Sequence, residues 1–431
     1  MARAGWPGKI SWGTYDLANT MFSMNVISLY FPLWVASSFH RGEVWYAIAY
    51  SFSMLLVAVV SPLAGTEGDR NGHKRVLFLA TTVAVILTAL LGFGHSIVSV
   101  LVIFVAANFG YQVGLVSYNS LLTSVAEPRE RGMVSGVGVA LGYVGSFVGM
   151  FAAFPFVNHG AFEKLPAFLQ HAVSALAIGG APAGAVPARA NAFLPTAILF
   201  ALFSLPLFFF VRERREGRRP STTGSLREVT ATFREIIRRR NLRNFYLATF
   251  LYMDAVHTVY IVMATYAKFA IGLDDGQILE SMSIALAAAV IGSFLYGILA
   301  DRVTGRTALM TVLANWVVVM VVAVFAHGFG GFVTVAVIAG CGLGGVEAVR
   351  RVALLSLIDE EESGRYFGFF NFTGKASSII GPQLWALVLF LFEGWGGIRF
   401  RIAVGVMLLL VIAAIGVLRR VEFPPVSRVA A

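Results

Sequence analysis

Twelve apolar runs, each long enough to cross a lipid bilayer, constrain the fold of this chain more than any other feature of its sequence. They cover about residues 12–37, 44–65, 76–94, 98–124, 133–156, 193–212, 244–270, 277–300, 306–326, 330–357, 367–392 and 398–418. A transmembrane α-helix needs about 20 mostly apolar residues. The sequence therefore predicts an all-α integral membrane protein with twelve transmembrane helices.

Charge is scarce for a chain of this length. Only 13% of the 431 residues are charged and 58% are hydrophobic, whereas soluble domains have about 25% charged residues. The net charge of +10 lies in short loops between the apolar runs, so it indicates membrane topology and not a nucleic-acid-binding face. The single cysteine, Cys341, excludes a disulfide framework and a cysteine-based metal site within the chain. We expect no cofactor and no metal.

Lysine and arginine predict the orientation. With the N-terminus inside, 24 of the 33 Lys and Arg residues fall in cytoplasmic segments and five on the opposite side, so both termini are expected to be cytoplasmic. The expected domains are an N-terminal six-helix bundle at 1–212, a basic linker with an amphipathic helix at 213–243, and a C-terminal six-helix bundle with a short tail at 244–431. The first apolar run is too long and polar for a cleaved signal, and we expect a multi-pass protein of the cell (inner) membrane.

Two features repeat between the halves of the sequence. One is a G-x-x-x-D-R loop followed by Gly and a basic residue, made by Gly65, Asp69, Arg70, Gly72 and Arg75, and again by Gly297, Asp301, Arg302, Gly305 and Arg306. The other is Asp16-x-x-Asn19-Thr20 in the first span and Asp254-x-x-His257-Thr258 in the seventh. These repeats predict two pseudo-symmetric bundles with substrate between them. We interpret the loops as gating elements; simple topogenic charge is the alternative.

The two loops resemble those of the major facilitator superfamily. Within it, several stretches are similar to the "unknown major facilitator", or vacuole-effluxer-like, family: residues 12–22, 118–122, 135–145, 250–258 and 367–382. The chain departs from that pattern at Glu67, Gly68, His257, Glu347 and Arg350. The resemblance implies the major facilitator fold and solute transport. Because the family includes a fungal vacuolar amino-acid effluxer, it also implies an amino acid or a similar solute.

Ionisable residues within membrane spans are costly and mark solute or proton paths. Asp254 and His257 lie three residues apart, so they share one face of the seventh span. We expect one of them to carry a coupling proton, with a purely structural pair as the alternative. Lys375 is a lone cation in the eleventh span, and we expect it to meet Asp254 or Glu347 across a cavity.

Three charged residues of the tenth span, Glu347, Arg350 and Arg351, stand at helical spacing. Glu347 can pair with either arginine, and the remaining guanidinium then suits a carboxylate or phosphate. Alternatively, Arg351 snorkels to the membrane surface or pairs with Asp359. Polar residues of the first and fourth spans are further candidates to line the path: Asn19, Gln112 and Asn119.

Together these patterns predict a secondary active, proton-coupled transporter that moves a small zwitterionic or anionic solute, such as an amino acid, by alternating access. Two alternatives stay open: an exporter of metal or organic anions, and a receptor of the same fold without flux. An enzyme is not expected, because the sequence has no metal-spaced histidine cluster, G-x-S-x-G motif or Walker A loop. The expected partners are the solute, the lipid bilayer and protons, without nucleic acid, and the expected state is a monomer.

Overall fold

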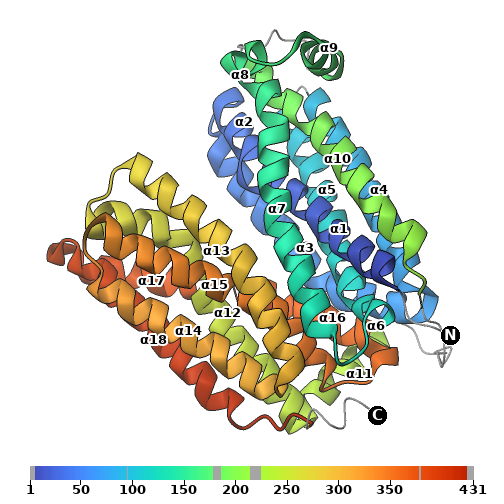
Figure 1. Ribbon diagram of the computed structural model, residues 1–431, viewed down its shortest axis with the longest axis vertical. Helices are drawn as coiled ribbons and strands as arrows, with labels where there is room; N and C mark the ends of the chain where they lie inside the picture. Colours follow the sequence, from blue (N-terminus) through green and yellow to red (C-terminus); the bar gives the residue numbers. More distant parts are fainter. Residues whose placement is uncertain (1–4, 95, 178–185, 214–224, 378–379, 425–431) are drawn as a thin grey trace. The chain divides into compact units, whose positions relative to one another are not determined.

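The computed structural model describes residues 5–94, 96–177, 186–213, 225–377 and 380–424, and within these ranges the regular structure is entirely helical. Among the described residues, eleven helices are long and apolar enough to cross a membrane. The first predicted span is interrupted: it consists of α1 (Trp6–Phe22), the π-helical turn η1 (Ser23–Ser28) and α2 (Tyr30–Ser38). The described residues thus form the all-α fold that the sequence predicts, with these eleven helices and the interrupted first span (Figure 1).

The helices pack into two compact units. Unit 1 comprises Met1–Val125 and Leu141–Arg219, and unit 2 comprises Ala126–Ala140 and Pro220–Ala431. The long helix α7 (Arg131–Val157) therefore contributes its first residues to unit 2 and the rest to unit 1. The domain limits expected from the sequence, 1–212, 213–243 and 244–431, stay a prediction; residues 214–224 of that linker lie outside the described residues.

Unit 1 is held together by an aromatic core. Phe31 stacks on Phe104 with ring centroids 4.6 Å apart, and Phe22 stacks on Tyr111 at 4.7 Å. Offset aromatic pairs of this kind stabilise a fold by roughly 0.5–1.5 kcal/mol beyond the contribution of the surface area that they bury. Besides α1, α2 and most of α7, the helices of this unit are α3 (Gly42–Asn71), α4 (His73–Leu90), η2 (Leu91–Phe93), α5 (Ile97–Ser120), α6 (Leu122–Val125), α8 (His159–Glu163), α9 (Ala167–Leu176), η3 (Val186–Ala192) and α10 (Phe193–Phe210).

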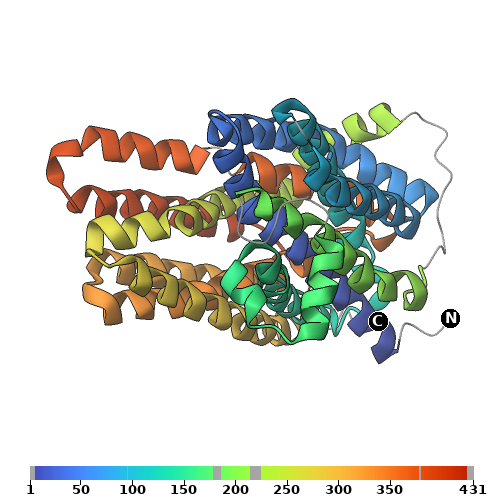
Figure 2. The same cartoon turned by 90° about the horizontal axis from the view of Figure 1, so that it is seen from above.

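Unit 2 contains the remaining helices. They are α11 (Ser225–Arg238), α12 (Arg240–Tyr266), η4 (Ala267–Ile271), α13 (Asp275–Arg302), α14 (Gly305–Phe325), α15 (Gly328–Leu355), η5 (Glu360–Glu362), α16 (Ser363–Ala376), α17 (Ile380–Leu391), η6 (Glu393–Trp395) and α18 (Ile398–Leu418). Figures 1 and 2 show α17 and α18 running side by side, joined through η6 at one end of the unit. The predicted helix of the basic linker is present as α11.

Small residues bring helices of each unit into backbone contact. A Cβ on Gly145 of α7 would lie 2.2 Å from the carbonyl oxygen of Leu17 in α1, and one on Gly344 of α15 would lie 2.2 Å from that of Ala289 in α13. Lipid tails are as apolar as Leu, so close packing of small residues is a main attraction between membrane helices. Glycines therefore allow α7 to pack closely on α1, and α15 on α13.

The eleventh predicted span, residues 367–392, contains two helices among the described residues. Helix α16 ends at Ala376 and α17 begins at Ile380, and residues 378–379 between them lie outside the described residues. Pro382 is the third residue of α17. Proline is well tolerated in the first turn of a helix, because its missing N–H would have no helical partner there.

Candidate functional site

An ion pair lies at the centre of the candidate site in unit 2. On α15, Arg350 donates through Nε and Nη2 to Oε2 of Glu347, at 3.0 and 2.7 Å. The predicted pairing of Glu347 with an arginine of its own helix is thus confirmed. The Arg350 guanidinium also lies 4.7 Å from the centre of the Phe370 ring of α16, a cation–π arrangement.

A histidine and a lysine from neighbouring helices lie within electrostatic range of this pair. His257 of α12 interacts with both Glu347 and Arg350, and so does Lys375 of α16. All four side chains are partly buried. We call His257, Glu347, Arg350 and Lys375 the charged cluster; it joins α12, α15 and α16 of one unit. Of the two partners expected for Lys375, the structure places it near Glu347.

Asp254 has a different position from the cluster residues, although it shares α12 with His257. Its side chain is 1% exposed, and Oδ1 accepts a hydrogen bond of 2.7 Å from the backbone N–H of Gly381. Gly381 is the second residue of α17, where unpaired N–H groups favour a carboxylate. Asp254 therefore anchors the start of α17, the second helix of the eleventh span.

Arg351 is buried on α15, with 7% of its surface exposed. Its Nε donates to the backbone carbonyl of Glu347 at 3.1 Å. This contact holds the guanidinium against its own helix and close to the ion pair. The two roles considered for Arg351, solute binding and an interaction at the helix end, both stay predictions.

The polar candidates of the N-terminal half belong to unit 1. Asn19 of α1 and Gln112 of α5 are buried, and Asn119 is partly buried near the end of α5. The neighbouring Asn108 donates to Ser53 of α3 at 2.7 Å, so at least one amide of this stripe makes an interhelical hydrogen bond. A role of Asn19, Gln112 and Asn119 in the solute path stays a prediction.

The second G-x-x-x-D-R loop binds the start of α7. The Asp301 carboxylate accepts hydrogen bonds from the backbone N–H groups of Gly132 and Met133, at 2.6 and 2.7 Å. Both N–H groups belong to the first turn of α7, where a carboxylate is favoured. Gly297 makes the approach possible, because a Cβ there would lie 2.5 Å from the Gly132 carbonyl oxygen. Arg302 is exposed.

The same loop also contacts the chain after α18. The Arg306 guanidinium donates to the carbonyl of Val421 through Nε at 3.0 Å. A Cβ on Gly305 would lie 2.7 Å from the ring of Phe423. Together with Asp301, these residues make the loop a junction of α13, α14, the start of α7 and the end of α18 within unit 2.

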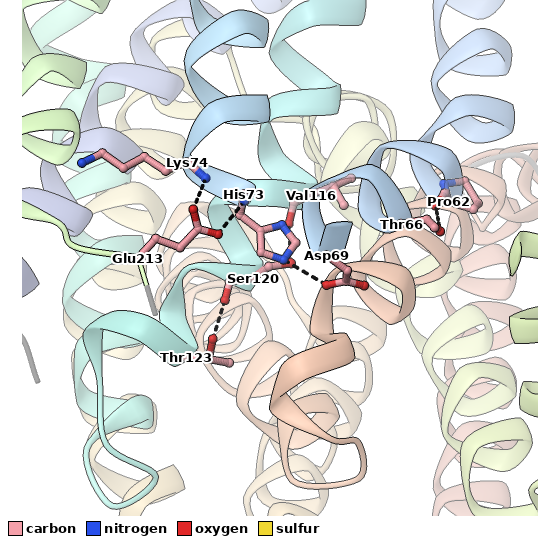
Figure 3. Close-up of polar contacts among 9 residues, drawn as sticks. All are labelled: Pro62, Thr66, Asp69, His73, Lys74, Val116, Ser120, Thr123 and Glu213. Atoms are coloured by element: carbon pink, nitrogen blue, oxygen red, sulfur yellow. Dashed lines mark hydrogen bonds and ion pairs between the residues drawn. The ribbon is translucent and has the colours of Figure 1, made fainter. Parts of the chain in front are cut away.

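The first loop is organised around His73 (Figure 3). The His73 ring is hydrogen-bonded through Nε2 to Asp69 at 3.0 Å, and Glu213 accepts from the backbone N–H groups of His73 and Lys74 at 2.6 and 3.2 Å. The turn needs Gly72, whose φ of +106° is rarely adopted by other residues. Arg70 and Arg75 are exposed, and Gly65 is buried in α3. In the two loops, the equivalent aspartates thus have different partners.

Gly68 explains one departure of the sequence from the family pattern. A Cβ at this position would lie 2.2 Å from Nδ1 of His73, so the histidine ring occupies the place of a side chain at Gly68. The second loop has Ala300 at the equivalent position and Arg306 where the first has His73. Gly68 and His73 therefore form a complementary pair that the second loop lacks.

We expect Gly68→Ala to lower the free energy of unfolding by about 1–3 kcal/mol, because the new methyl group displaces the buried ring. In a His73→Ala background the same substitution should lower the free energy of unfolding much less, since the ring that clashes with the methyl group is absent. A double-mutant cycle of thermal unfolding checks this coupling. Equal costs of Gly68→Ala in both backgrounds would contradict the packing described here.

Sequence reasoning missed several residues of these sites. Phe370, whose ring lies under the Arg350 guanidinium, is one of 36 phenylalanines, and nothing in the sequence separates it from those that face lipid. Gly381 carries a signal, the Gly-Pro pair inside an apolar run. Glu213 lies about 140 residues from His73 in the chain, so only the fold reveals their contact.

The apolar spanning helices of the described residues and the two D-R loops are typical of solute transporters with the major facilitator fold. The solved structure of the Major Facilitator Superfamily transporter FucP in the outward conformation aligns with a TM-score of 0.75 and 13% identity, over 97% of this chain and 99% of FucP. The human organic anion transporter MFSD10 (TETRAN) aligns with a TM-score of 0.70 and 14% identity, over 96% of this chain and 98% of its own.

Sequence comparison gives the family. The model described as "Major Facilitator Superfamily" matches residues 7–154, and the model described as "Vacuole effluxer Atg22 like" matches residues 123–424, well over half of the chain. The chain belongs to the vacuole effluxer Atg22-like family, as the sequence motifs indicate. A relative, the "Uncharacterized MFS-type transporter YxiO" of Bacillus subtilis (strain 168), is 28% identical over 389 residues, which covers 88% of this chain and 87% of YxiO. The protein is thus a multi-pass membrane transporter and not an enzyme.

Proposed function

We propose that the protein is a secondary active transporter that moves a small zwitterionic or anionic organic solute, such as an amino acid, by alternating access. The charged cluster is the observation that carries this proposal. Glu347 neutralises Arg350, while Lys375 supplies a second positive charge close by. A site with both signs of charge can bind the carboxylate of a solute through a cation and its ammonium group through Glu347.

We propose that the coupling proton is carried by His257. Its neighbours in the cluster are Glu347, Arg350 and Lys375, so its protonation changes the net charge next to the proposed solute site. Asp254, the other candidate, is bound to the start of α17 and suits a positioning role. This assignment is supported if His257→Gln removes the pH dependence of transport and Asp254→Asn does not. Unchanged pH dependence in both variants contradicts coupling through either residue.

Export of an organic anion is a second candidate function. It is favoured by the two cations, Arg350 and Lys375, beside the single carboxylate of the cluster. MFSD10 is described as an organic anion transporter. For metal export, the residues that the structure describes contain no group of three or more His, Cys, Asp or Glu side chains placed to hold an ion, and our proposal includes no metal.

The remaining parts of the proposal concern topology and gating. The excess of Lys and Arg in alternate loops supports cytoplasmic termini and a place in the cell (inner) membrane. The D-R loops join helix ends within their own units, which supports a role in stabilising one transport state. We propose a monomer as the functional unit, as the two internal repeats already supply two halves.

A screen followed by flux tests the proposed function. We expect the purified protein to be stabilised against heat by one or more amino acids or organic anions, because ligand binding to the folded state raises stability. The same compounds should enter or leave proteoliposomes that contain the protein, and a pH gradient should change their rate. Stabilisation without flux would favour the receptor alternative. No response to any solute of either class would contradict the proposal.

A further inference from the structure

A pocket of about 560 Å³ lies in unit 2, away from the charged cluster. Its lining is strongly basic and comes from segments far apart in the chain: Arg239, Arg240, Asn241, Leu242, Arg306, Leu357, Arg419, Arg420 and Glu422. Five of these nine residues are arginines and one is acidic. Pockets of about 300–1,000 Å³ are typical of small-molecule sites.

The basic pocket lies at the level where the membrane spans end. Arg240 is the first residue of α12, Arg306 is the second residue of α14, and Arg419 directly follows α18. Leu357 lies two residues beyond the end of α15. Four spans of unit 2 thus bring these residues together at one membrane–water boundary, on the side that we propose to be cytoplasmic.

Several contacts fix the shape of the pocket. Asn241 and Glu422 are joined by two hydrogen bonds through the Glu422 backbone, at 3.1 and 3.3 Å. Arg306 is bonded to the Val421 carbonyl, and Arg239 forms an ion pair of 2.7 Å with Glu235 of α11. These contacts hold the segment after α18 against the starts of α12 and α14.

Most of the positive charge of the pocket is directed to solvent. Arg240, Arg419 and Arg420 are exposed, and none of them forms an ion pair with another residue of the described ranges. Like charges gathered in one concave site repel each other, and a bound anion relieves that repulsion. Guanidinium groups donate in planar pairs that match the oxygens of a phosphate group.

We propose that the basic pocket binds a multiply charged, phosphate-bearing anion. Such a ligand links the starts of α12 and α14 to the end of α18, and so it stabilises the junction made by the second D-R loop. Anionic lipid headgroups and soluble phosphate compounds share this chemistry, and basic pockets between membrane helices are known to bind lipid headgroups. The site is distinct from the proposed solute site, and it does not depend on the transport proposal.

Thermal unfolding of the full-length protein tests the proposal with two probes. Pyrophosphate added in detergent represents a soluble phosphate compound, and nanodiscs of phosphatidylcholine with cardiolipin, compared with phosphatidylcholine alone, represent a lipid headgroup. The pocket variant combines Arg419→Gln and Arg420→Gln. Its matched control combines Arg227→Gln and Arg234→Gln, which remove the same charge from exposed positions of α11 that do not line the pocket.

We expect at least one probe to stabilise the wild-type protein and the control. For the pocket variant the apparent affinity for that probe should fall by at least roughly tenfold, since two charge-assisted contacts are lost. A response to pyrophosphate assigns a soluble ligand, and a response to cardiolipin assigns a lipid. If the pocket variant unfolds without ligand at a lower temperature than the control, Arg240→Gln takes its place. The proposal is overturned if neither probe stabilises the wild-type protein, or if pocket and control variants respond alike.

Discussion

Replacing Arg350 by glutamine should reduce solute flux at least roughly tenfold, a loss of about 1.4 kcal/mol or more in the interaction that drives transport. The reason is the ion pair between Arg350 and Glu347 inside the membrane span. Without the guanidinium, Glu347 keeps a charge that His257 and Lys375 of the cluster and the neighbouring Arg351 have to balance. Breaking one partner of a buried pair costs about 3–5 kcal/mol. Both side chains here are partly exposed, so we expect about 1–3 kcal/mol of lost stability.

A charge-reversed double variant separates the two effects. Glu347→Arg combined with Arg350→Glu keeps a pair at the same helical spacing, so it should recover most of the thermal stability. Flux should stay low, because the charges that face the solute have exchanged places. Arg234→Gln, an exposed arginine of α11, serves as the control for loss of charge. Wild-type flux in Arg350→Gln would show that the pair is only structural.

Introducing a methyl group at Gly381 should disrupt the packing of α17 against α12. A Cβ there would lie 2.1 Å from Oγ1 of Thr258 and 2.9 Å from the carbonyl oxygen of Asp254. The hydrogen bond from Gly381 to Asp254 depends on the same close approach of α17 to α12. We expect Gly381→Ala to lower the free energy of unfolding by about 1–3 kcal/mol, typical of overpacking, and to reduce flux with it.

Gly405→Ala is the matched control for this substitution. Gly405 lies in α18, and a methyl group at this position would have no neighbouring atom within 4 Å, while alanine is the better helix former by about 1 kcal/mol. Thermal unfolding and flux of both variants are compared in the same lipid. Destabilisation of similar size in the two variants would mean that the contact between α17 and α12 has no special role.

Local spacing allowed part of the charged cluster to be predicted. Glu347 and Arg350 pair because residues three apart face each other on any helix, and the apolar runs place them inside a span. The meeting of His257 and Lys375 with this pair depends on the packing of α12, α15 and α16. The sequence repeat indicates related halves but contains no distances between those helices.

Other features follow only from contacts between distant segments. Asp254 shares a helix face with His257, and its carboxylate accepts a hydrogen bond from the backbone of Gly381, 127 residues further along the chain. The repeated D-R loops have the same pattern, but Asp301 binds the start of α7 while Asp69 binds His73. The basic pocket joins three helix ends and the segment after α18. In each case the residue contacts a backbone group or a side chain from a distant segment. The local sequence around that group does not mark it as a contact.

Flux through proteoliposomes containing the wild-type protein, Lys375→Gln or Lys164→Gln tests the central claim, that the charged cluster of unit 2 handles the solute. Lys164 is exposed in the loop after α8, so its variant controls for the lost charge. For an amino acid or organic anion that stabilises the wild-type protein, we expect equal flux in the wild type and Lys164→Gln. We expect flux at least roughly tenfold lower in Lys375→Gln at unchanged thermal stability. Equal flux in all three proteins would show that the charged cluster does not handle the solute.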